Sequence, residues 1–230
     1  PRRQHSPRSF TRGGGLQSAA EALARTPGVD VAAGRGATAI AAAGGGFSVT
    51  PAAGAPHAAG IVAVATPPGS AAALLGGVAP DVGAEAAKVG EAVVETLGFA
   101  VRAEKVRELP VSMFLVPRRD AFYSIVTRDS VPDPAWRAFS FHFRPGLTVD
   151  ERLDRATKVL GLSRADAEES AERRTVLPSP VLGHETVVAE IDRLSAGRKL
   201  CVLGNWFGGL SIEDCVDRSR REWARVAAIG

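Results

Sequence analysis

Several features are scarce or missing in this sequence, and each absence narrows the class of protein. No apolar run reaches the length of a membrane-spanning helix, and no segment has the pattern of a secretory signal peptide. No block of lysine and arginine is interleaved with aromatic residues, although the net charge is +3 and the pI is near 9.3. The sequence therefore predicts no transmembrane helix and no binding of nucleic acid.

Residues that hold metals or form disulfides are also few. The two cysteines, Cys201 and Cys215, belong to no metal-ligand spacing. The histidines are scattered along the chain: His5, His57, His142 and His184. We therefore expect no metal site, and a reducing, cytoplasmic location is the simplest expectation.

Methionine is scarcer still. The chain begins with Pro1, and its single methionine is Met113. Either a natural start has been removed or the sequence is a piece of a longer protein. Its 230 residues, of which 45% are hydrophobic and 23% charged, suffice for one large globular domain or two small ones.

The hydrophobic pattern divides the chain into three blocks, residues 1–70, 71–176 and 177–230. In the first block, apolar residues at helical spacing predict a helix over 17–25. Short apolar runs bounded by glycine and proline predict strands at 29–33, 37–42, 47–50 and 61–65.

A run of strands dominates the second block. They are expected at 92–100, 111–116, 122–128 and 136–143, without intervening helices, which favours an antiparallel sheet. Helices are expected at 70–75, 148–160 and 164–173, the last with Ser163 as its N-cap.

The third block ends in a glycine-rich turn. The pattern predicts a helix over 185–194, a buried strand over 200–203 and a closing helix over 211–227. Gly204, Gly208 and Gly209 lie between the last two elements. Such a turn directs free backbone N–H groups and the positive end of a helix dipole at one spot. It predicts contact with a phosphate or a flavin pyrimidine edge, or else it is an ordinary tight connection.

Six short segments occur in an order that is typical of one enzyme family. They are Ser9-Phe10…Gly14-Gly15-Leu16-Gln17, Ile61 to Pro68, the helix at 71–80, Leu97-Gly98-Phe99 with Phe114-Leu115-Val116-Pro117, Pro180…Gly183-His184, and Gly204-Asn205…Gly208-Gly209…Asp214-Cys215. Together they resemble the FAD-dependent protoporphyrinogen oxidases, within the wider flavin amine oxidase and phytoene desaturase superfamily.

This resemblance implies a fold and an activity. The fold class is α/β (α+β): an incomplete FAD-binding domain of Rossmann-like type, formed by 1–70 and 177–230, plus an antiparallel-sheet substrate domain in 71–176. The implied cofactor is FAD. The implied reaction oxidises a porphyrinogen-like or other large apolar reductant by hydride transfer to the flavin, with oxygen as acceptor. The resemblance also allows peripheral contact with a membrane.

The resemblance further implies which residues contact the cofactor. In the closing motif they are Gly204, Asn205, Gly208, Gly209, Leu210, Ser211 and Ile212, mostly through their backbone. Ala37 begins the strand that would read the adenine. We expect Asn205, Leu210, Ser211 and Ile212 to border a cleft, with 37–42 and 61–65 as neighbouring walls. No catalytic side chain is implied.

The sequence also departs from the family. The opening strand with G-x-G-x-x-G is absent, and Gly13-Gly14-Gly15 is no substitute because no strand precedes it. An upstream or second polypeptide is expected to carry that motif, and this chain alone is expected not to retain flavin. Arg173-Arg174 stands where the family often has an aromatic–proline pair. The second hypothesis is therefore a non-catalytic, degenerate or split family member that binds a partner polypeptide.

Three side chains near the closing turn have simpler interpretations. Phe207 is expected to pack in the core, and Trp206 either packs or borders the isoalloxazine ring. His184 is expected to be a structural hydrogen-bonding residue at the start of a helix, because a lone histidine is a weak signal for a catalytic base.

Overall fold

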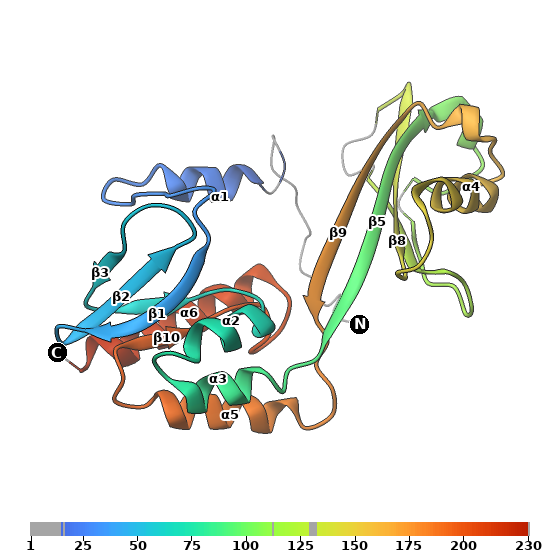
Figure 1. The fold of residues 1–230 in the computed structure, drawn as a ribbon. Helices are drawn as coiled ribbons and strands as arrows, with labels where there is room; N and C mark the ends of the chain where they lie inside the picture. Colours follow the sequence, from blue (N-terminus) through green and yellow to red (C-terminus); the bar gives the residue numbers. More distant parts are fainter. Residues whose placement is uncertain (1–14, 16, 112, 129–132, 230) are drawn as a thin grey trace, which may run out of the picture. The chain divides into compact units, whose positions relative to one another are not determined.

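The computed structural model describes residues 15, 17–111, 113–128 and 133–229 (Figure 1). The chain divides into two compact units, residues 1–35 and 36–230. The first unit contains α1 (Gln17–Ala24), as predicted, and none of its residues is buried. The strand predicted at 29–33 is wrong, because this exposed stretch has no strand to pair with among the described residues. The predicted segment from Ser9 to Gly14 lies outside the described residues.

The second unit begins with a small antiparallel sheet. Its strands β1 (Ala37–Ala43), β2 (Gly46–Pro51) and β3 (His57–Ala59) lie in the order β1-β2-β3. Gly44 and Gly45 have φ of 55° and 80°, which glycine adopts readily, and they make the tight β1–β2 turn. The strands at 37–42 and 47–50 were predicted; β3, three residues long and mostly exposed, was not.

A two-stranded parallel sheet forms the centre of this part of the chain. It pairs β4 (Val62–Val64) with β10 (Leu200–Val202), and Ala63 lies opposite Cys201. Helices α2 (Pro68–Leu75), α3 (Pro80–Ala86) and α5 (His184–Ser195) contribute to the core that covers it. The helix α3 was not predicted, although Pro80 at its first position is a common start signal.

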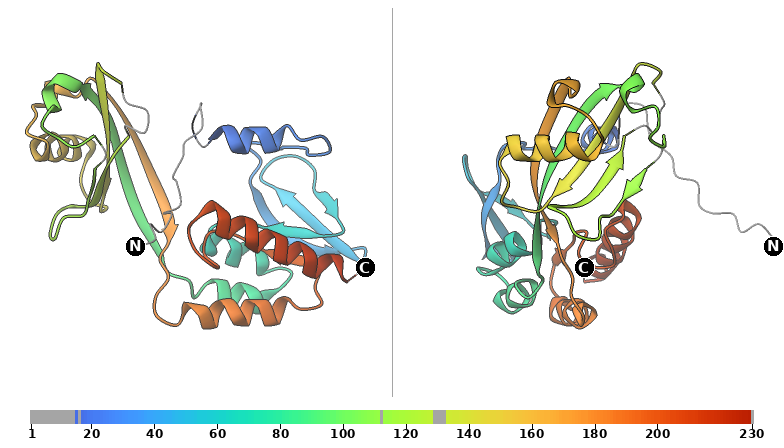
Figure 2. Two further views of the ribbon diagram at one scale, coloured as in Figure 1. Left: turned by 180° about the vertical axis from the view of Figure 1, so that it is seen from behind. Right: turned by 90° about the vertical axis from the view of Figure 1, so that its right-hand side faces the viewer.

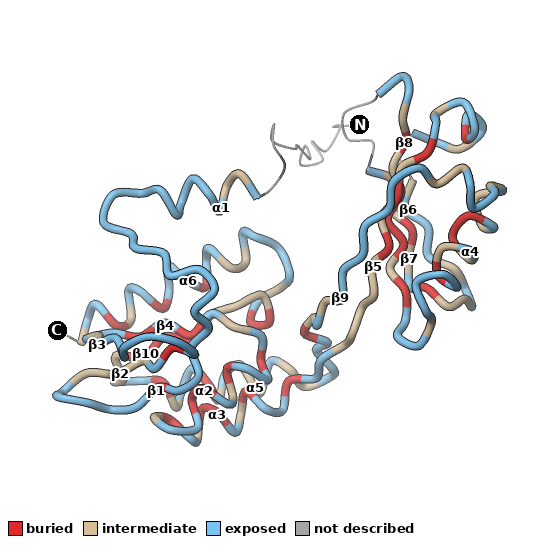
Figure 3. Tube along the Cα trace, turned by 45° about the horizontal axis from the view of Figure 1, so that its top comes forward, coloured by how far each residue is buried: buried red, intermediate tan, exposed pale blue. Residues whose placement is uncertain are grey.

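The other sheet has five antiparallel strands in the order β6-β7-β8-β5-β9. They are β5 (Glu91–Arg102), β6 (Phe114–Leu115), β7 (Phe122–Thr127), β8 (Trp136–Phe143) and β9 (Glu169–Pro178). Alternate residues of β8, namely Phe139, Phe141 and Phe143, are fully buried on the face that packs under α4 (Val149–Val159) (Figure 3). The antiparallel sheet is therefore as predicted, although β6 is shorter than the strand expected at 111–116.

The helix predicted at 164–173 is wrong. A single 3₁₀ turn, η2 (Arg164–Asp166), is followed by β9, which pairs with β5 along its whole length (Figure 2). Pro178 lies opposite Glu91 at one end of this pair, and Glu169 lies opposite Ala100 at the other. Ser163 does cap this turn, through a reciprocal pair with Asp166. The long partner strand overrides the local helical preference, because β9 gains a ladder of hydrogen bonds along its whole length.

The closing helix α6 (Ile212–Ala227) begins where it was predicted, with Ser211 as its N-cap. The predicted order of buried strand, glycine turn and helix at the end of the chain is therefore present. No helix among the described residues is long and apolar enough to cross a membrane.

Candidate functional site

A cavity of about 450 Å³ lies at the carboxyl ends of the two parallel strands. Ala65, Thr66 and Pro67 follow β4, and Leu203, Gly204 and Asn205 follow β10. The remaining wall comes from the end of β9 and from α6, and consists of Thr175, Val176, Leu177, Pro178, Cys215 and Ser219. Ligands of open α/β sheets bind in the crevice outside the carboxyl ends of the strands, so this cavity is the candidate site.

Thr66 and Trp206 join the two strand ends. The Trp206 indole Nε1 donates to the carbonyl oxygen of Thr66 at 3.1 Å, across 140 residues of sequence. The Thr66 hydroxyl, in contrast, is buried and has no partner in the described part of the chain. A buried hydroxyl without a hydrogen bond costs free energy, so it marks a place where a polar group of a ligand would be stabilised.

A side chain would meet different surroundings at each of the three glycines of the closing turn. At Gly204, φ is +138°, and an added Cβ would lie 2.6 Å from the Trp206 Nε1. At Gly209, an added Cβ would overlap the Asp214 carboxylate. Gly208 is exposed and has nothing within 4 Å of the Cβ position. The protein itself therefore explains Gly204 and Gly209, whereas Gly208 leaves open room for a group outside the chain.

The start of α6 leaves two backbone donors free. Ser211 and Asp214 form a capping box, in which the Asp214 N–H donates to the Ser211 hydroxyl and the Ser211 N–H donates to the Asp214 carboxylate. No described group accepts from the N–H of Ile212 or Glu213. These two donors, together with the positive end of the helix dipole, favour an electron-rich partner at this point.

The predicted cofactor-contacting residues do not all border one cavity. Gly204 and Asn205 line the strand-end cavity, whereas Ile212 lines an apolar groove on α6, and Leu210 and Ser211 are exposed beside it. Leu210 and Ile212 are 62% and 64% exposed, so neither is sealed in the core. Whether these residues contact a flavin stays a prediction.

Of the two strands predicted to line the cleft, only the one at 61–65 contributes a residue to the strand-end cavity. Ala65, at the end of the predicted strand 61–65, lines the cavity. The strand at 37–42 does not: Ala37 is exposed on β1, and Ala42 lines a separate cavity of about 550 Å³ beside Arg198 and Lys199. The reason is topological, because β1 pairs with β2 in another sheet and does not join the parallel pair.

The aromatic residues of the turn are structural. Trp206 and Phe207 are both buried, with ring centroids 4.1 Å apart, which confirms packing for Phe207 and decides the open question for Trp206. The His184 Nε2 lies 2.5 Å from the carbonyl oxygen of Trp206, which confirms a structural hydrogen-bonding role. These contacts hold the glycine turn against the start of α5.

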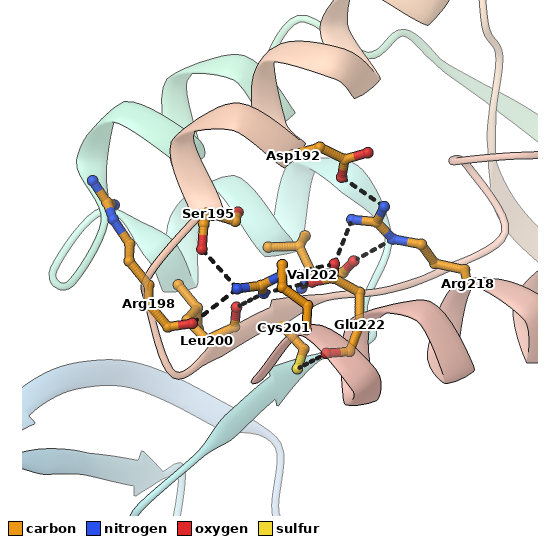
Figure 4. Close-up of polar contacts among 9 residues, drawn as sticks. Asp192, Ser195, Arg198, Leu200, Cys201, Val202, Arg218 and Glu222 are labelled. Atoms are coloured by element: carbon orange, nitrogen blue, oxygen red, sulfur yellow. Dashed lines mark hydrogen bonds and ion pairs between the residues drawn. The ribbon is translucent and has the colours of Figure 1, made fainter. Parts of the chain in front are cut away.

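The polar network beneath this turn was not predicted (Figure 4). Arg218 and Glu222 of α6 are 3% and 4% exposed. Arg218 bonds to the carbonyl oxygen of Val202 and to Asp192, and Glu222 bonds to Arg225. Charged residues four apart, on the side of a terminal helix that faces a buried strand, are the sequence signal for this network.

The two cysteines differ in their burial and surroundings. Burial, and then the neighbouring Glu222, raise the pKa of the Cys201 thiol, which disfavours the nucleophilic thiolate. Cys215 is half-buried and lines the strand-end cavity. Among the described residues no cluster of His, Cys, Asp and Glu could hold a metal ion, and no charged side chain lines the cavity.

Comparison with known proteins shows the fold. No protein-family model matches the chain, and no curated protein matches its sequence. Several structures of putrescine oxidase match 94% of this chain and 53% of their own; TM-scores reach 0.69 at 14% identity, and one structure is bound to putrescine. Cyclohexylamine oxidase from Brevibacterium oxydans matches 84% of this chain and 47% of its own (TM-score 0.59, 14% identity). Reduced UDP-galactopyranose mutase matches 86% and 47% (TM-score 0.64, 15% identity).

The predicted fold class is confirmed: the chain has part of the FAD-binding amine oxidase fold, with antiparallel sheets. It spans about half the length of the solved structures it matches. At 14–15% identity the similarity shows the fold alone, and the relation to the flavin amine oxidase superfamily and to its protoporphyrinogen oxidases stays a proposal.

Proposed function

We propose that this chain supplies part of an FAD-dependent oxidoreductase, and that the strand-end cavity holds the flavin ring. The observation that carries the proposal is the unpartnered Thr66 hydroxyl beside the Gly204–Asn205 backbone, where two parallel strands end. A volume of about 450 Å³ is in the usual range for cofactor sites. The fold similarity to amine oxidases supports a flavin as the cofactor.

The residues present fit a flavin ring in three respects. The Thr66 hydroxyl can donate to, or accept from, a polar ring atom. The free N–H groups of Ile212 and Glu213 lie outside the cavity lining and would donate to an electron-rich edge of a ring that extends to the start of α6, where the helix dipole stabilises negative charge. Gly208 leaves room for close approach to the backbone.

The cofactor and this chain would then have separate roles in the reaction. When bound, FAD would accept a hydride from the substrate and be reoxidised by oxygen. This chain would orient the ring through Thr66 and the closing turn. Its apolar wall, formed by Val176, Leu177 and Leu203, would exclude water. No side chain of the cavity is placed as a general acid or base.

We propose a porphyrinogen-like or other large apolar reductant as the substrate, because the order of the sequence segments resembles that of the protoporphyrinogen oxidases. The strand-end cavity is assigned to the flavin ring, so the substrate would approach the ring from outside this cavity. The cavity lining offers no charged side chain to pair with a cationic amine such as the putrescine bound in one of the matched structures.

The alternative is a non-catalytic scaffold that binds a partner polypeptide. It is favoured by one observation: the chain matches about half of each solved structure. The two functions differ in what happens when a dinucleotide-binding part is supplied, because only the first requires flavin to bind.

The test is a fusion protein in which a strand–G-x-G-x-x-G–helix segment is joined to the full chain. We expect stoichiometric flavin absorption after purification with FAD, and its bleaching without oxygen by a tetrapyrrole reductant but not by putrescine. Thr66→Val should lower flavin content severalfold, while Thr50→Val, an exposed threonine on β2, should not. A folded fusion without flavin would contradict the proposal and favour the scaffold.

A further inference from the structure

A second cavity lies at the opposite end of β10 from the strand-end cavity. It has a volume of about 550 Å³ and is lined by Leu200, the first residue of β10, whereas Leu203 and Gly204 follow the last residue of this strand. The other lining residues are 42–47 around the β1–β2 turn, Val78 between α2 and α3, and residues 198–199 before β10. We call it the hairpin cavity, and the proposed flavin site makes no use of it.

The lining of the hairpin cavity carries positive charge. Arg198 and Lys199 line it, and no aspartate or glutamate does. Asp81, outside the lining, accepts two hydrogen bonds of 2.8 and 2.6 Å from the Arg198 guanidinium and so holds it in place. Figure 4 shows the Arg198 guanidinium pointing away from the polar network of α6. Asp81 balances the charge of Arg198, so Lys199 leaves the cavity with a net positive charge that favours an anion.

The β1–β2 turn adds two backbone donors to the same cavity. Gly44 and Gly45 have φ of 55° and 80°, and no described group accepts from the N–H of either residue. A side chain at either position would meet nothing within 4 Å, so the backbone is open to a ligand. Successive N–H groups in a turn can form a concave binding site for an anion. The hairpin cavity therefore combines backbone donors with cationic side chains.

The remaining wall of the hairpin cavity is apolar. Leu200 is buried, and Phe47 and Val78 are half-buried against the same hydrophobic core. An inorganic ion would leave this carbon surface in contact with water, whereas an organic group attached to the anion would cover it. The lining therefore fits a ligand with two parts, an anionic head and a compact apolar body.

We propose that the hairpin cavity binds a small organic phosphate monoester. Its phosphate lies among the cationic side chains and the glycine N–H groups, and its apolar body lies against Phe47, Val78 and Leu200. A phosphate fits better than a carboxylate because it offers three acceptor oxygens and a charge near −2 to several donors at once. This site is independent of the proposed flavin site, because the two cavities share no lining residue.

Titration of the ¹⁵N-labelled full chain with phenyl phosphate, followed by NMR, tests this site. Phenyl phosphate has both parts of the proposed ligand, whereas phenol and inorganic phosphate have one part each. We expect the amide signals of Gly44, Gly45 and Lys199 to shift, with an affinity at least about tenfold higher than for phenol or inorganic phosphate. Equal affinity for either of these two, or no shifts in the β1–β2 turn, would overturn the proposal.

Two pairs of variants separate binding in the cavity from general electrostatic attraction. Lys199→Met should weaken the binding of phenyl phosphate about tenfold, and Lys158→Met, at an exposed lysine on α4, should not. Ala43→Glu should weaken it similarly by repulsion, and Ala41→Glu, at an exposed position of β1 outside the lining, should change it at most about twofold.

The two variants of each pair change the net charge of the chain equally. Equal weakening within a pair would overturn the site, because binding would then depend on total charge and not on position. Ala43 and Ala41 are both exposed, so this pair decides the question if Lys199→Met fails to fold.

Discussion

The indole of Trp206 donates a hydrogen bond to the carbonyl oxygen of Thr66, and this contact fixes the ends of two parallel strands 140 residues apart in sequence. Trp206 is 1% exposed and also occupies the space that a side chain at Gly204 would need. The glycine, the tryptophan and the strand end therefore form one structural unit beneath the candidate site.

Replacing Trp206 should weaken the fold. Trp206→Phe removes the indole N–H and leaves the Thr66 carbonyl without its partner, which should lower the free energy of unfolding by about 1–2 kcal/mol. Chemical denaturation measures this change. Trp223→Phe is the control, because Trp223 is 63% exposed. Equal destabilisation by both would mean that the Trp206–Thr66 contact is unimportant.

Alanine substitutions at Gly208 and Gly209 should differ in their effect on the free energy of unfolding. Gly209→Ala would push against Asp214 and disturb the α6 cap, so the free energy of unfolding should fall by about 1 kcal/mol. Gly208→Ala has open space and should leave stability nearly unchanged. Thermal unfolding checks both variants, and the reverse order would contradict the roles given to these two glycines.

In the flavin-loaded fusion, Gly209→Val should abolish flavin incorporation, because it distorts the turn that approaches the ring. Glu213→Gln should leave incorporation nearly intact, because the Glu213 side chain is exposed and the helix offers its backbone N–H. Absorption at the flavin band reports both. Greater loss with Glu213→Gln would show that the motif acts through charge.

Acid should weaken the contact between α3 and the turn before β10. The hydrogen-bonded Arg198 lowers the pKa of Asp81 from 3.8 to about 2. Between these values the unfolded chain binds the proton more readily, so this stabilisation is complete above about pH 4 and is lost as the pH falls toward 2.

The effect should be small, because both side chains are more than a third exposed. Asp81→Asn should flatten the dependence of unfolding free energy on pH between 4 and 2. Asp30→Asn is the control, since Asp30 forms no ion pair with the described residues. An unchanged slope in Asp81→Asn would contradict the assigned role of this pair.

The two thiols should differ in reactivity. Cys201 is 4% exposed and its pKa is raised by burial, whereas Cys215 lines the cavity. An alkylating reagent at mildly alkaline pH should modify Cys215 first, as read by mass spectrometry of peptides. In the flavin-loaded fusion the labelling of Cys215 should slow severalfold. Labelling of Cys201 at the same rate would show that β10 is not buried.

The sequence predicted the closing strand, turn and helix and most strands of the antiparallel sheet, because these follow from local apolar patterns and glycine positions. It did not predict β9, whose charged segment around Glu172 is a strand because it pairs with β5. The Thr66 hydroxyl and the α6 network were also missed, since burial of a polar group depends on elements distant in sequence. Ala37 was placed beside the cleft, but sheet order puts β1 elsewhere.

The most direct test of the flavin site is a titration of the ¹⁵N-labelled full chain with riboflavin, followed by NMR. Riboflavin carries the isoalloxazine ring without the dinucleotide phosphates, so its binding does not depend on a phosphate-binding glycine motif. We predict that the amide signals of Thr66, Gly204 and Asn205, which line the strand-end cavity, shift together with those of Ile212 and Glu213 at the start of α6, with weak affinity. Shifts confined to the separate cavity around Ala42 and Lys199, or no shifts in the closing turn, would contradict a flavin site at the ends of β4 and β10.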